Sequence, residues 1–310
     1  MKTKILATGL TGLVGSRFME LLDEVYEFEH MSLSNGIDIL DKEAVFNKIS
    51  SSEASVVIHM AAKANVDGCE KDKERDKELL EFKNSQEAEE AWRNEKTAWA
   101  VNVFGTQNVV DACQKTNKKL VYISTDFVFD GTKKSYTEDE KPNPINWYAK
   151  TKYEGEKLIQ NSGLDYIIAR IAYPYRAMFE RNDFVRGLIE KLGKSEKLTM
   201  VWDHIMVPTF IDDIANALDI LIRTEQKGIF HVVGSQRITP FNAAIAIAQE
   251  FGFDESLISK TTRNEYFAGK APRPFCLYLK NDKISKLGIE MSTFDKGLVE
   301  IKNQLDRIHI

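Results

Sequence analysis

The sequence predicts an α/β fold in which a parallel, doubly wound sheet carries helices on both faces. Three observations predict it. Short apolar runs alternate with amphipathic stretches, as strands and helices alternate in such a sheet. Runs such as Leu120–Ile123 and Tyr166–Ala169 have no polar alternation, which is typical of strands buried on both faces. A glycine cluster directly follows the first run, where a strand turns into a helix.

The elements follow this alternation from the N-terminus onward. Ile5–Ala7 is expected to be the first strand, and Ser16–Leu22 has the apolar spacing of the helix after it. The remaining expected elements are a strand around Phe28–Leu33, a helix at Asp41–Ile49, a strand at Ser55–His59, a helix at Thr97–Thr116, a strand at Leu120–Ile123, a helix at Tyr148–Ser162, a strand at Tyr166–Ala169 and a strand at Gly228–Val233.

Composition excludes several classes of protein. The chain has 310 residues, 43% of them hydrophobic, which is enough for one substantial core or two modest ones. A net charge of −5 disfavours a nucleic-acid binder, because phosphate neutralisation needs a basic surplus. The three cysteines and five histidines are scattered, so neither a disulfide framework nor a zinc site is expected. No run is long enough for a signal peptide or membrane span, and we expect a cytoplasmic protein.

One charged segment, Glu70–Lys96, interrupts the alternation. Fourteen of its first 21 residues are Asp, Glu, Lys or Arg. This composition favours a solvated helical insertion. The alternative is a lid or an oligomer contact, because the segment leaves the sheet after the third strand, at the carboxyl edge where ligands bind.

Gly9, Gly12 and Gly15 have the spacing G-x-x-G-x-x-G between the first strand and its helix. Glycines at this place let the backbone turn sharply and approach a pyrophosphate at the helix N-terminus. Leu13 and Val14 belong to the same turn. A purely structural glycine turn is the alternative.

The residues at the end of the second strand bear on whether the glycine turn would bind NADPH or NADH. Met31–Gly36 has no acidic residue to hold the adenosine ribose, and Ser34 there offers a neutral hydroxyl. Arg17, in the first turn of the first helix, is expected to supply a counter-charge for a 2′-phosphate. The pattern favours NADPH and leaves NADH open, since Arg17 is also compatible with simple exposure.

Tyr148 and Lys152 are four residues apart, so they share one face of a helix. There the cation favours the phenolate and brings the phenol within reach of proton transfer near neutral pH. Ser124 and Thr125 end an apolar strand, where a hydroxyl can bind a substrate carbonyl. The alternatives are an exposed Tyr beside a solvated Lys, and a plain strand-end cap.

Several motifs carry a resemblance to a known family along nearly the whole chain. They are the glycine turn, Ala61-Ala62-x-x-x-Val66-Asp67, Asn102-Val103-x-Gly105-Thr106, Ser124-Thr125-Asp126-Phe127-Val128-Phe129-Asp130-Gly131 and Tyr148-x-Lys150-Thr151-Lys152-x-x-Gly155-Glu156. The chain resembles the extended short-chain dehydrogenase/reductases and, within them, the dTDP-4-dehydrorhamnose reductases. The resemblance implies a Rossmann sheet and a catalytic triad of Thr125, Tyr148 and Lys152.

The same resemblance implies further site residues. The cofactor would be lined by Asp38, Ile39, Ala61, Ala62, Lys63, Asn102 and Pro174, in addition to the glycine turn, Arg17, Ser34, Tyr148 and Lys152. The substrate would be bound by Ser124, Asp126, Phe127, Tyr173 and Arg273. Arg273 lies in an Arg-Pro turn, and an Arg can pair bidentately with a nucleotide-sugar diphosphate; a rigid exposed turn is the alternative.

No linker rich in Pro, Gly or Ser separates two domains, so a smaller α/β substrate-binding lobe is expected to be inserted late in the chain. We expect residues 1–171 and 206–236 to form the NAD(P)-binding Rossmann domain and residues 172–205 and 237–310 to form the lobe. Monomer and homodimer both remain open. Where some related reductases carry a Glu for a magnesium-linked dimer this chain has Arg17, so no metal site is expected.

The expected activity is the NADPH-dependent reduction of a nucleotide-linked 4-keto-6-deoxy sugar, with dTDP-4-dehydro-L-rhamnose as the first candidate. In related dehydratases the corresponding tripeptide resembles Thr-Asp-Glu, whereas this chain has Thr125-Asp126-Phe127. Dehydration is therefore not expected. Two alternatives stay open. One is a nucleotide-sugar epimerase that keeps NAD bound, and the other is a non-catalytic regulatory subunit resembling that of methionine adenosyltransferase.

Overall fold

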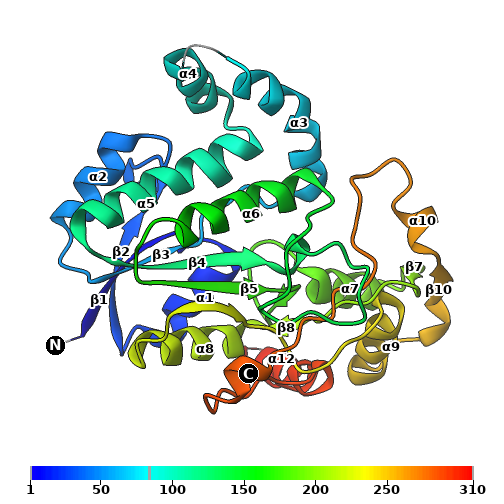
Figure 1. Ribbon diagram of the computed structural model, residues 1–310. Helices are drawn as coiled ribbons and strands as arrows, with labels where there is room; N and C mark the ends of the chain where they lie inside the picture. The colour runs from blue at the N-terminus through cyan, green and yellow to red at the C-terminus, as the bar shows by residue number, and fades with distance from the viewer. Residues whose placement is uncertain (1, 83–84, 309–310) are drawn as a thin grey trace.

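A six-stranded parallel sheet forms the centre of the molecule, in the order β2-β1-β3-β4-β5-β9 (Figure 1). The computed structural model describes residues 2–82 and 85–308. The strands are β1 Thr3–Thr8, β2 Tyr26–Met31, β3 Val56–His59, β4 Lys119–Thr125, β5 Tyr166–Ile171 and β9 Gly228–His231. The order reverses at β1, which pairs with β2 on one side and β3 on the other. Dinucleotides bind beside such a reversal. The parallel sheet confirms the predicted fold class.

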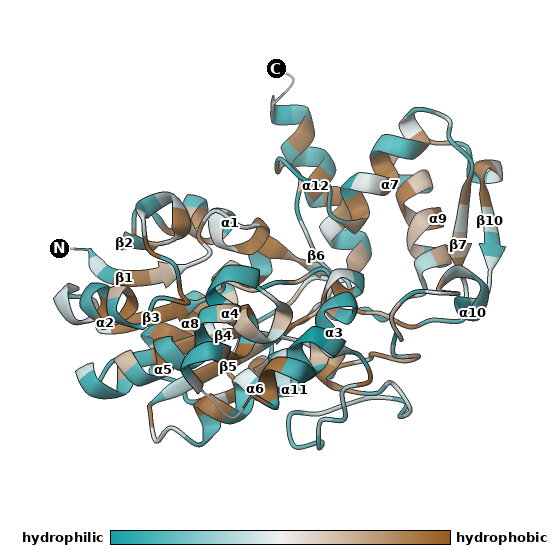
Figure 2. Cartoon of the chain, turned by 90° about the horizontal axis from the view of Figure 1, so that it is seen from above, coloured by the Kyte–Doolittle hydropathy of each residue, from teal (hydrophilic) through white to brown (hydrophobic). Residues whose placement is uncertain are grey.

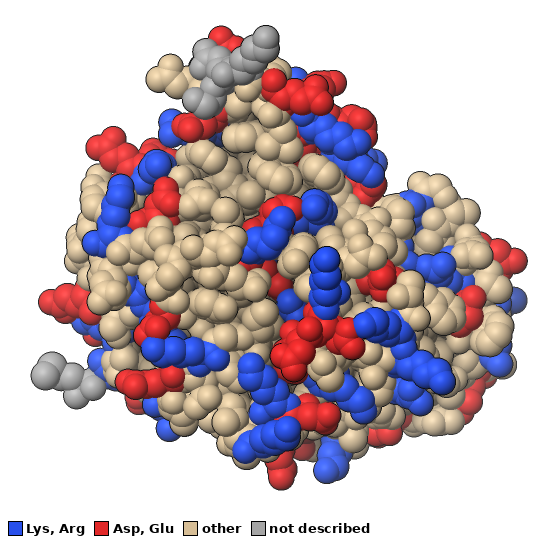
Figure 3. Space-filling view, in the orientation of Figure 1, with Lys and Arg blue, Asp and Glu red and all other residues tan. Residues whose placement is uncertain are grey.

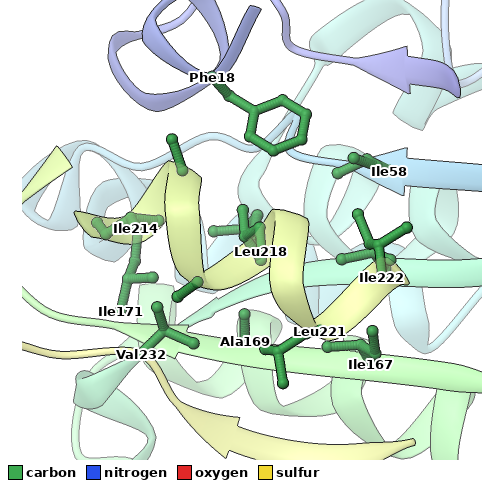
Figure 4. Packing of buried hydrophobic residues seen from close by; sticks show 14 of the residues in the cluster. Phe18, Ile58, Ile167, Ala169, Ile171, Ile214, Leu218, Leu221, Ile222 and Val232 are labelled. Carbon is green, nitrogen blue, oxygen red and sulfur yellow. The ribbon is translucent and has the colours of Figure 1, made fainter. Parts of the chain in front are cut away.

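Helices cover both faces of this sheet. One face carries α2 Lys42–Ser51, α5 Gly105–Thr116 and α6 Trp147–Gln160, and the other carries α1 Leu13–Leu22 and α8 Ile211–Arg223 (Figure 1). Figure 4 shows Phe18 of α1 and Leu218 of α8 packed toward the sheet residues Ile58 and Ile167. All four side chains are fully buried. Removing this apolar surface from water is the main force that holds both helices on the sheet.

A second hydrophobic core lies beyond the carboxyl edge of the sheet. Two parallel strands pair there, β7 Leu198–Val201 and β10 Ile258–Thr261. The helices that share this core are α7 Phe184–Gly193, α9 Pro240–Phe251 and α12 Phe294–Ile308. The remaining short elements are β6 Pro174–Tyr175, β8 Thr209–Phe210, α10 Arg263–Tyr266 and α11 Asp282–Ser285. The domain boundaries given above stay a prediction.

Several elements begin or end elsewhere than expected. The helix expected at Thr97–Thr116 is a π-helix over Ala100–Phe104 followed by α5. β2 spans Tyr26–Met31 and not Phe28–Leu33, because its pairing with β1 ends where Met31 meets Thr8. Leu33, the expected end of that strand, begins a short 3-10 helix and is 63% exposed. The first helix starts at Leu13, directly after Gly12 and three residues earlier than its apolar pattern indicates.

The charged segment forms two helices, α3 Val66–Leu80 and α4 Ser85–Glu95; residues 83 and 84 lie outside the described residues. Both project beyond the layer of α5 and α6 in Figure 1, and α3 is largely hydrophilic in Figure 2. Helical structure was expected here. Nowhere in residues 2–82 and 85–308 is a helix long and apolar enough to cross a membrane.

Candidate active site

The glycine turn between β1 and α1 lines a cavity of about 530 Å³ at the carboxyl edge of the sheet. Gly9 has a φ of +72°, and a Cβ there would lie 2.8 Å from the backbone nitrogen of Ala61. A Cβ on Gly15 would lie 2.4 Å from the carbonyl oxygen of Gly9, so glycine alone fits both positions. Gly12 precedes α1 without a capping side chain, which leaves the first N–H groups of the helix open to an anion. The turn therefore fits a pyrophosphate.

Most of the residues predicted from the sequence line this cavity. They are Gly9, Gly12, Leu13, Val14, Gly15, Ala62, Ser124, Thr125, Asp126, Tyr148, Lys152, Tyr173 and Pro174. Sequence reasoning missed Arg181 and Asn182, which line the same cavity from the segment before α7. That segment has no motif spacing by which it could have been found.

Three predicted cofactor residues do not line this cavity. Asn102 is buried, accepts from the backbone N–H of Lys63 at 2.8 Å and donates to the Lys63 carbonyl at 3.0 Å. The ammonium of Lys63 pairs with Asp72 at 2.7 Å. The N–H of Ala61 donates to the hydroxyl of Thr8 at 3.0 Å. These contacts fix the path of the chain after β3, and a direct cofactor contact of the three stays a prediction.

Three others lie beyond the end of β2. Ser34 is exposed, with its hydroxyl 2.8 Å from that of Ser32. The carboxylate of Asp38 pairs with Lys96 at 3.0 Å. Ile39 is buried below Gly105, where an added Cβ would lie 2.7 Å from its Cδ1. None of the three lines the 530 Å³ cavity, so their place beside an adenosine also stays a prediction.

The structure corrects the role expected for Arg17. Its Nε and one terminal nitrogen donate to the two carboxylate oxygens of Asp212, both at 2.7 Å. Its other terminal nitrogen donates to Glu20 at 3.2 Å. This bidentate pair ties α1 to α8 and uses the charge, so Arg17 is not a free counter-charge for a 2′-phosphate. The sequence position of Arg17 gave no sign of Asp212, which is 195 residues away.

Tyr148 and Lys152 share one face of α6, whose N-terminus is capped by Asn146. Burial raises the pKa of Tyr148 above its ordinary value of 10, and a hydrogen bond with Thr125 opposes part of that rise. Burial lowers the pKa of Lys152 to about 7, while its ammonium lies 4.0 Å from the centre of the Tyr122 ring. The expected acidification of the phenol by Lys152 is therefore corrected, because desolvation dominates at both groups.

Thr125 and Asp126 continue from the carboxyl end of β4. The hydroxyl of Thr125 donates to Asp126 Oδ1 at 3.0 Å. Asp126 is 2% exposed, and its Oδ2 has no hydrogen-bond partner among the described residues. Burial raises the pKa of Asp126 to about 7. A carboxyl group of this kind can take or give a hydrogen bond to a ligand near neutral pH.

A second cavity, of about 360 Å³, opens beside the first and is mostly apolar. Its lining includes the predicted residues Thr125, Asp126, Phe127, Tyr148, Tyr173 and Arg273, and the unpredicted residues Val66, Phe184, Met200, Val201, His204, Pro240, Tyr266 and Phe267. Thr125, Asp126, Tyr148 and Tyr173 line both cavities. The phenol and the Thr125 hydroxyl therefore lie where a ligand in one cavity would meet a ligand in the other.

Arg273 already has partners on its own side of the second cavity. One terminal nitrogen lies 3.0 Å from Asp67 Oδ1, and the other donates to the carbonyl of Ala271 at 2.7 Å. The N–H of Ala271 also donates to Asp67, at 3.0 Å. The start of α3 is thus bound to the loop that carries Arg273, and a diphosphate would have to share that guanidinium with Asp67.

A buried ion pair joins β5 to α6, the helix that carries Tyr148 and Lys152. Arg170 of β5 donates to both carboxylate oxygens of Glu156, at 3.0 and 2.7 Å, and both side chains are at most 1% exposed. Ser124 donates to the same carboxylate. The predicted substrate residue Ser124 therefore lines the first cavity while its hydroxyl is directed to Glu156. Glu156 also opposes the lowering of the pKa of Lys152.

The charged segment has a structural role that its composition did not indicate. Asp76 of α3 is fully buried and accepts from the indole N–H of Trp147 at 2.6 Å and from the backbone N–H of Trp99 at 3.1 Å. Glu70 accepts from the backbone N–H of Trp147 at 2.7 Å. Trp147 directly precedes Tyr148, so α3 holds the first turn of the helix that carries the phenol.

His59 offers a test of this buried polar interior through the pH dependence of stability. Its ring nitrogens lie 2.8 Å from the Thr8 hydroxyl and 3.0 Å from the Thr106 hydroxyl. Burial, assisted by the charge of Lys152, lowers the pKa of His59 to about 3. The folded pKa is below the unfolded one, near 6.5, so the contribution of neutral His59 is present above pH 6.5 and is lost as pH falls toward 3.

We expect the stability advantage of the wild type over His59→Gln to shrink by roughly 3 kcal/mol between pH 7 and pH 4. Urea unfolding of both proteins across that range measures it. Asp126, whose pKa is raised, has the opposite slope, but it is present in both proteins and cancels in the difference. A difference that stays constant over this range would show that His59 is not held neutral.

Comparison with known proteins places the chain among proteins of similar length. The family described as RmlD substrate binding domain matches residues 3–91 and 81–307. A dTDP-4-dehydrorhamnose reductase of Aggregatibacter actinomycetemcomitans is 30% identical over 319 residues, which covers 96% of this chain and 98% of the relative. The methionine adenosyltransferase 2 subunit beta of Xenopus tropicalis is 28% identical and covers 96% and 86%, respectively.

Solved structures agree with the sequence matches. The crystal structure of dTDP-4-dehydrorhamnose reductase from Bacillus anthracis in complex with NADP superposes with a TM-score of 0.85 at 27% identity, over 98% of this chain and all of that one. The resemblance found in the sequence is thereby confirmed. With the family match covering nearly the whole chain, the protein belongs to the RmlD substrate binding domain family of extended short-chain dehydrogenase/reductases.

Proposed function

We propose that this protein is an NADPH-preferring reductase of a nucleotide-linked 4-keto-6-deoxy sugar, with dTDP-4-dehydro-L-rhamnose as the expected substrate and dTDP-L-rhamnose as the product. One observation carries the proposal: Thr125 and Tyr148 line both the glycine-turn cavity and the apolar cavity beside it. Reductases of this sugar are among its relatives, and one of them was crystallised with NADP.

The proposed chemistry assigns one task to each residue of the triad. The glycine turn and Lys152 would hold the reduced dinucleotide, which would supply a hydride for C4 of the sugar. The Thr125 hydroxyl, which donates to Asp126 in this structure, would turn to donate to the carbonyl oxygen. Tyr148 would give that oxygen its proton, so that the ketone becomes an alcohol. The raised pKa of Tyr148 keeps the phenol protonated at neutral pH, which is the form that a proton donor needs. The ammonium of Lys152 can bind the nicotinamide ribose, and its positive charge would stabilise the phenolate that forms.

The remaining roles follow from the two cavities. We infer that residues 1–171 and 206–236 bind the dinucleotide and that residues 172–205 and 237–310 form the lobe for the sugar nucleotide. Asp126, Phe127 and Tyr173 would contact the sugar, and Arg273 the diphosphate. Charges of both signs intermingle on the face shown in Figure 3, so this face presents no continuous basic surface for nucleic acid. We propose a cytoplasmic monomer or homodimer.

Oxidation of NADPH by the purified protein tests the proposal, with dTDP-4-dehydro-L-rhamnose added last and the nicotinamide absorbance followed. We expect oxidation that depends on the sugar and yields one alcohol per NADPH consumed. Tightly bound NAD that copurifies, with conversion of a sugar but no net oxidation, would instead indicate the epimerase. No oxidation with any keto sugar tried would contradict the reductase.

One specific observation favours a second candidate, a non-catalytic regulatory subunit. The similarity to methionine adenosyltransferase 2 subunit beta covers 96% of this chain, almost as complete as the similarity to the reductase. Size-exclusion chromatography with a purified methionine adenosyltransferase catalytic subunit tests it. Co-elution of the two proteins, together with failure to reduce the keto sugar, would establish this role in place of the reductase.

A further inference from the structure

The 530 Å³ cavity beside the glycine turn is also lined by Arg181, an arginine that the sequence motifs did not reveal. Arg181 is exposed, lies between β6 and α7, and lines the same cavity as the glycine turn. It packs against the Phe179 ring, with 5.8 Å between guanidinium carbon and ring centre. Nearby arginines have carboxylate partners, Arg17 with Asp212 and Arg176 with Glu20, but within the described part of the chain Arg181 has no ion pair.

The segment that carries Arg181 is anchored at both ends. Arg176, before it, donates to the Ser16 hydroxyl at 2.8 Å and to Glu20 at 2.6 Å, and both acceptors belong to α1. Asp183, after it, accepts from the backbone N–H of Arg176 at 3.1 Å and caps α7. These bonds close a short loop beside the helix whose N-terminus forms the glycine turn. These bonds therefore fix the position of the loop that carries Arg181 beside the cavity.

A dinucleotide brings two negative charges to the turn at its pyrophosphate. The turn offers backbone N–H groups and the partial charge of a helix N-terminus, but no cation of its own. Among the described residues that line the cavity, the basic ones are Lys152 and Arg181. Lys152 lies next to Tyr148, at the end where the reaction would take place. The guanidinium of Arg181 is thus the cation placed to serve the pyrophosphate, which it can bind through two parallel hydrogen bonds.

We propose that Arg181 binds the pyrophosphate of the nicotinamide dinucleotide, closing the cavity over the glycine turn. This inference rests on the proposed function, because it takes the ligand of the cavity to be that dinucleotide. This role differs from the one expected of Arg17, which concerned the 2′-phosphate of NADPH. Pyrophosphate is common to NADPH and NADH, so Arg181 strengthens the binding of both and does not choose between them.

Binding of NADPH and NADH to the full-length protein, followed by the change in nicotinamide fluorescence, tests the assignment without reference to turnover. We expect Arg181→Gln to raise both dissociation constants about tenfold, as expected when one charge-assisted hydrogen-bonding partner is lost. Arg181→Lys keeps the charge and should recover a large part of the affinity. The salt dependence of binding should also become weaker in Arg181→Gln.

Arg237→Gln is a matched control. Arg237 is likewise exposed and packs over a ring, that of Tyr278 at 5.2 Å, but it does not line the cofactor cavity. Its dissociation constants should equal those of the wild type. Unchanged affinity in Arg181→Gln, with a wild type that binds, would overturn the assignment and leave the proposed function intact. A loss confined to NADPH would also overturn it, by placing Arg181 at the 2′-phosphate. A wild type that binds neither dinucleotide would overturn both.

Discussion

Tyr148→Phe is expected to lower kcat for the keto sugar by roughly 10²- to 10⁴-fold, the usual contribution of a positioned acid or base. The substitution removes the O–H that would give its proton to the carbonyl oxygen. The ring is kept, and so is its edge-to-face packing against Phe127, with centroids 6.2 Å apart. The dissociation constant for NADPH should therefore change little. Steady-state kinetics and direct cofactor titration on the same preparation measure the two effects.

Tyr153→Phe is the matched control for this loss. It makes the same chemical change on the same helix, five residues later, at a side chain that lines neither cavity. Its kcat should equal that of the wild type. If Tyr148→Phe retained activity within about tenfold of the wild type, another group would be the proton donor, and Asp126, with a pKa near 7 and a free oxygen, would be the first candidate.

Arg170→Met is expected to lower the free energy of unfolding by about 3–5 kcal/mol, the cost of leaving a buried charge without its partner. Among the described residues, the Glu156 carboxylate would then keep only the Ser124 hydroxyl as a hydrogen-bond partner, and the side chain is fully buried. The Arg170 guanidinium also lies 5.0 Å from the Phe129 ring, and that contact would be lost as well. Urea unfolding at neutral pH measures the change.

The surface pair Lys227–Asp165 supplies the control. Its atoms are 2.6 Å apart, but both side chains are 60% exposed, so Lys227→Met should cost at most about 1 kcal/mol. The double substitution Arg170→Met with Glu156→Leu should recover much of the stability lost in Arg170→Met alone, since no unpaired charge remains. Equal losses in Arg170→Met and Lys227→Met would show that the buried pair contributes no more than an exposed one.

Much of the cofactor cavity could be predicted from local sequence. Gly15 is required by the close approach of its backbone to Gly9 within the turn itself, so the spacing of these two glycines carries the geometry. Tyr148 and Lys152 are placed on one face by the period of a single helix. In each case the residues that must meet are close along the chain, and local patterns are sufficient.

The predictions that the structure corrected depend on partners far along the chain. Arg17 has the charge expected of a phosphate ligand, but Asp212, in another helix, takes that charge. The pKa values of Tyr148 and Lys152 are set by how deeply the pair is buried, which helical spacing does not reveal. Asp76 was counted as part of a solvated charged segment, although its carboxylate is enclosed by Trp99 and Trp147.

The sequence by itself determined the sheet, the glycine turn and the reactive face of one helix, because apolar periodicity and short spacings express directly what a strand, a turn and a helix require. Only the tertiary structure decided which charges are free and which are paired, and which side chains close the two cavities. Arg181 and His204 reach those cavities through the packing of segments that no short motif connects. Burial and long-range pairing arise when the chain is assembled, so they are properties of the fold and not of any local stretch of residues.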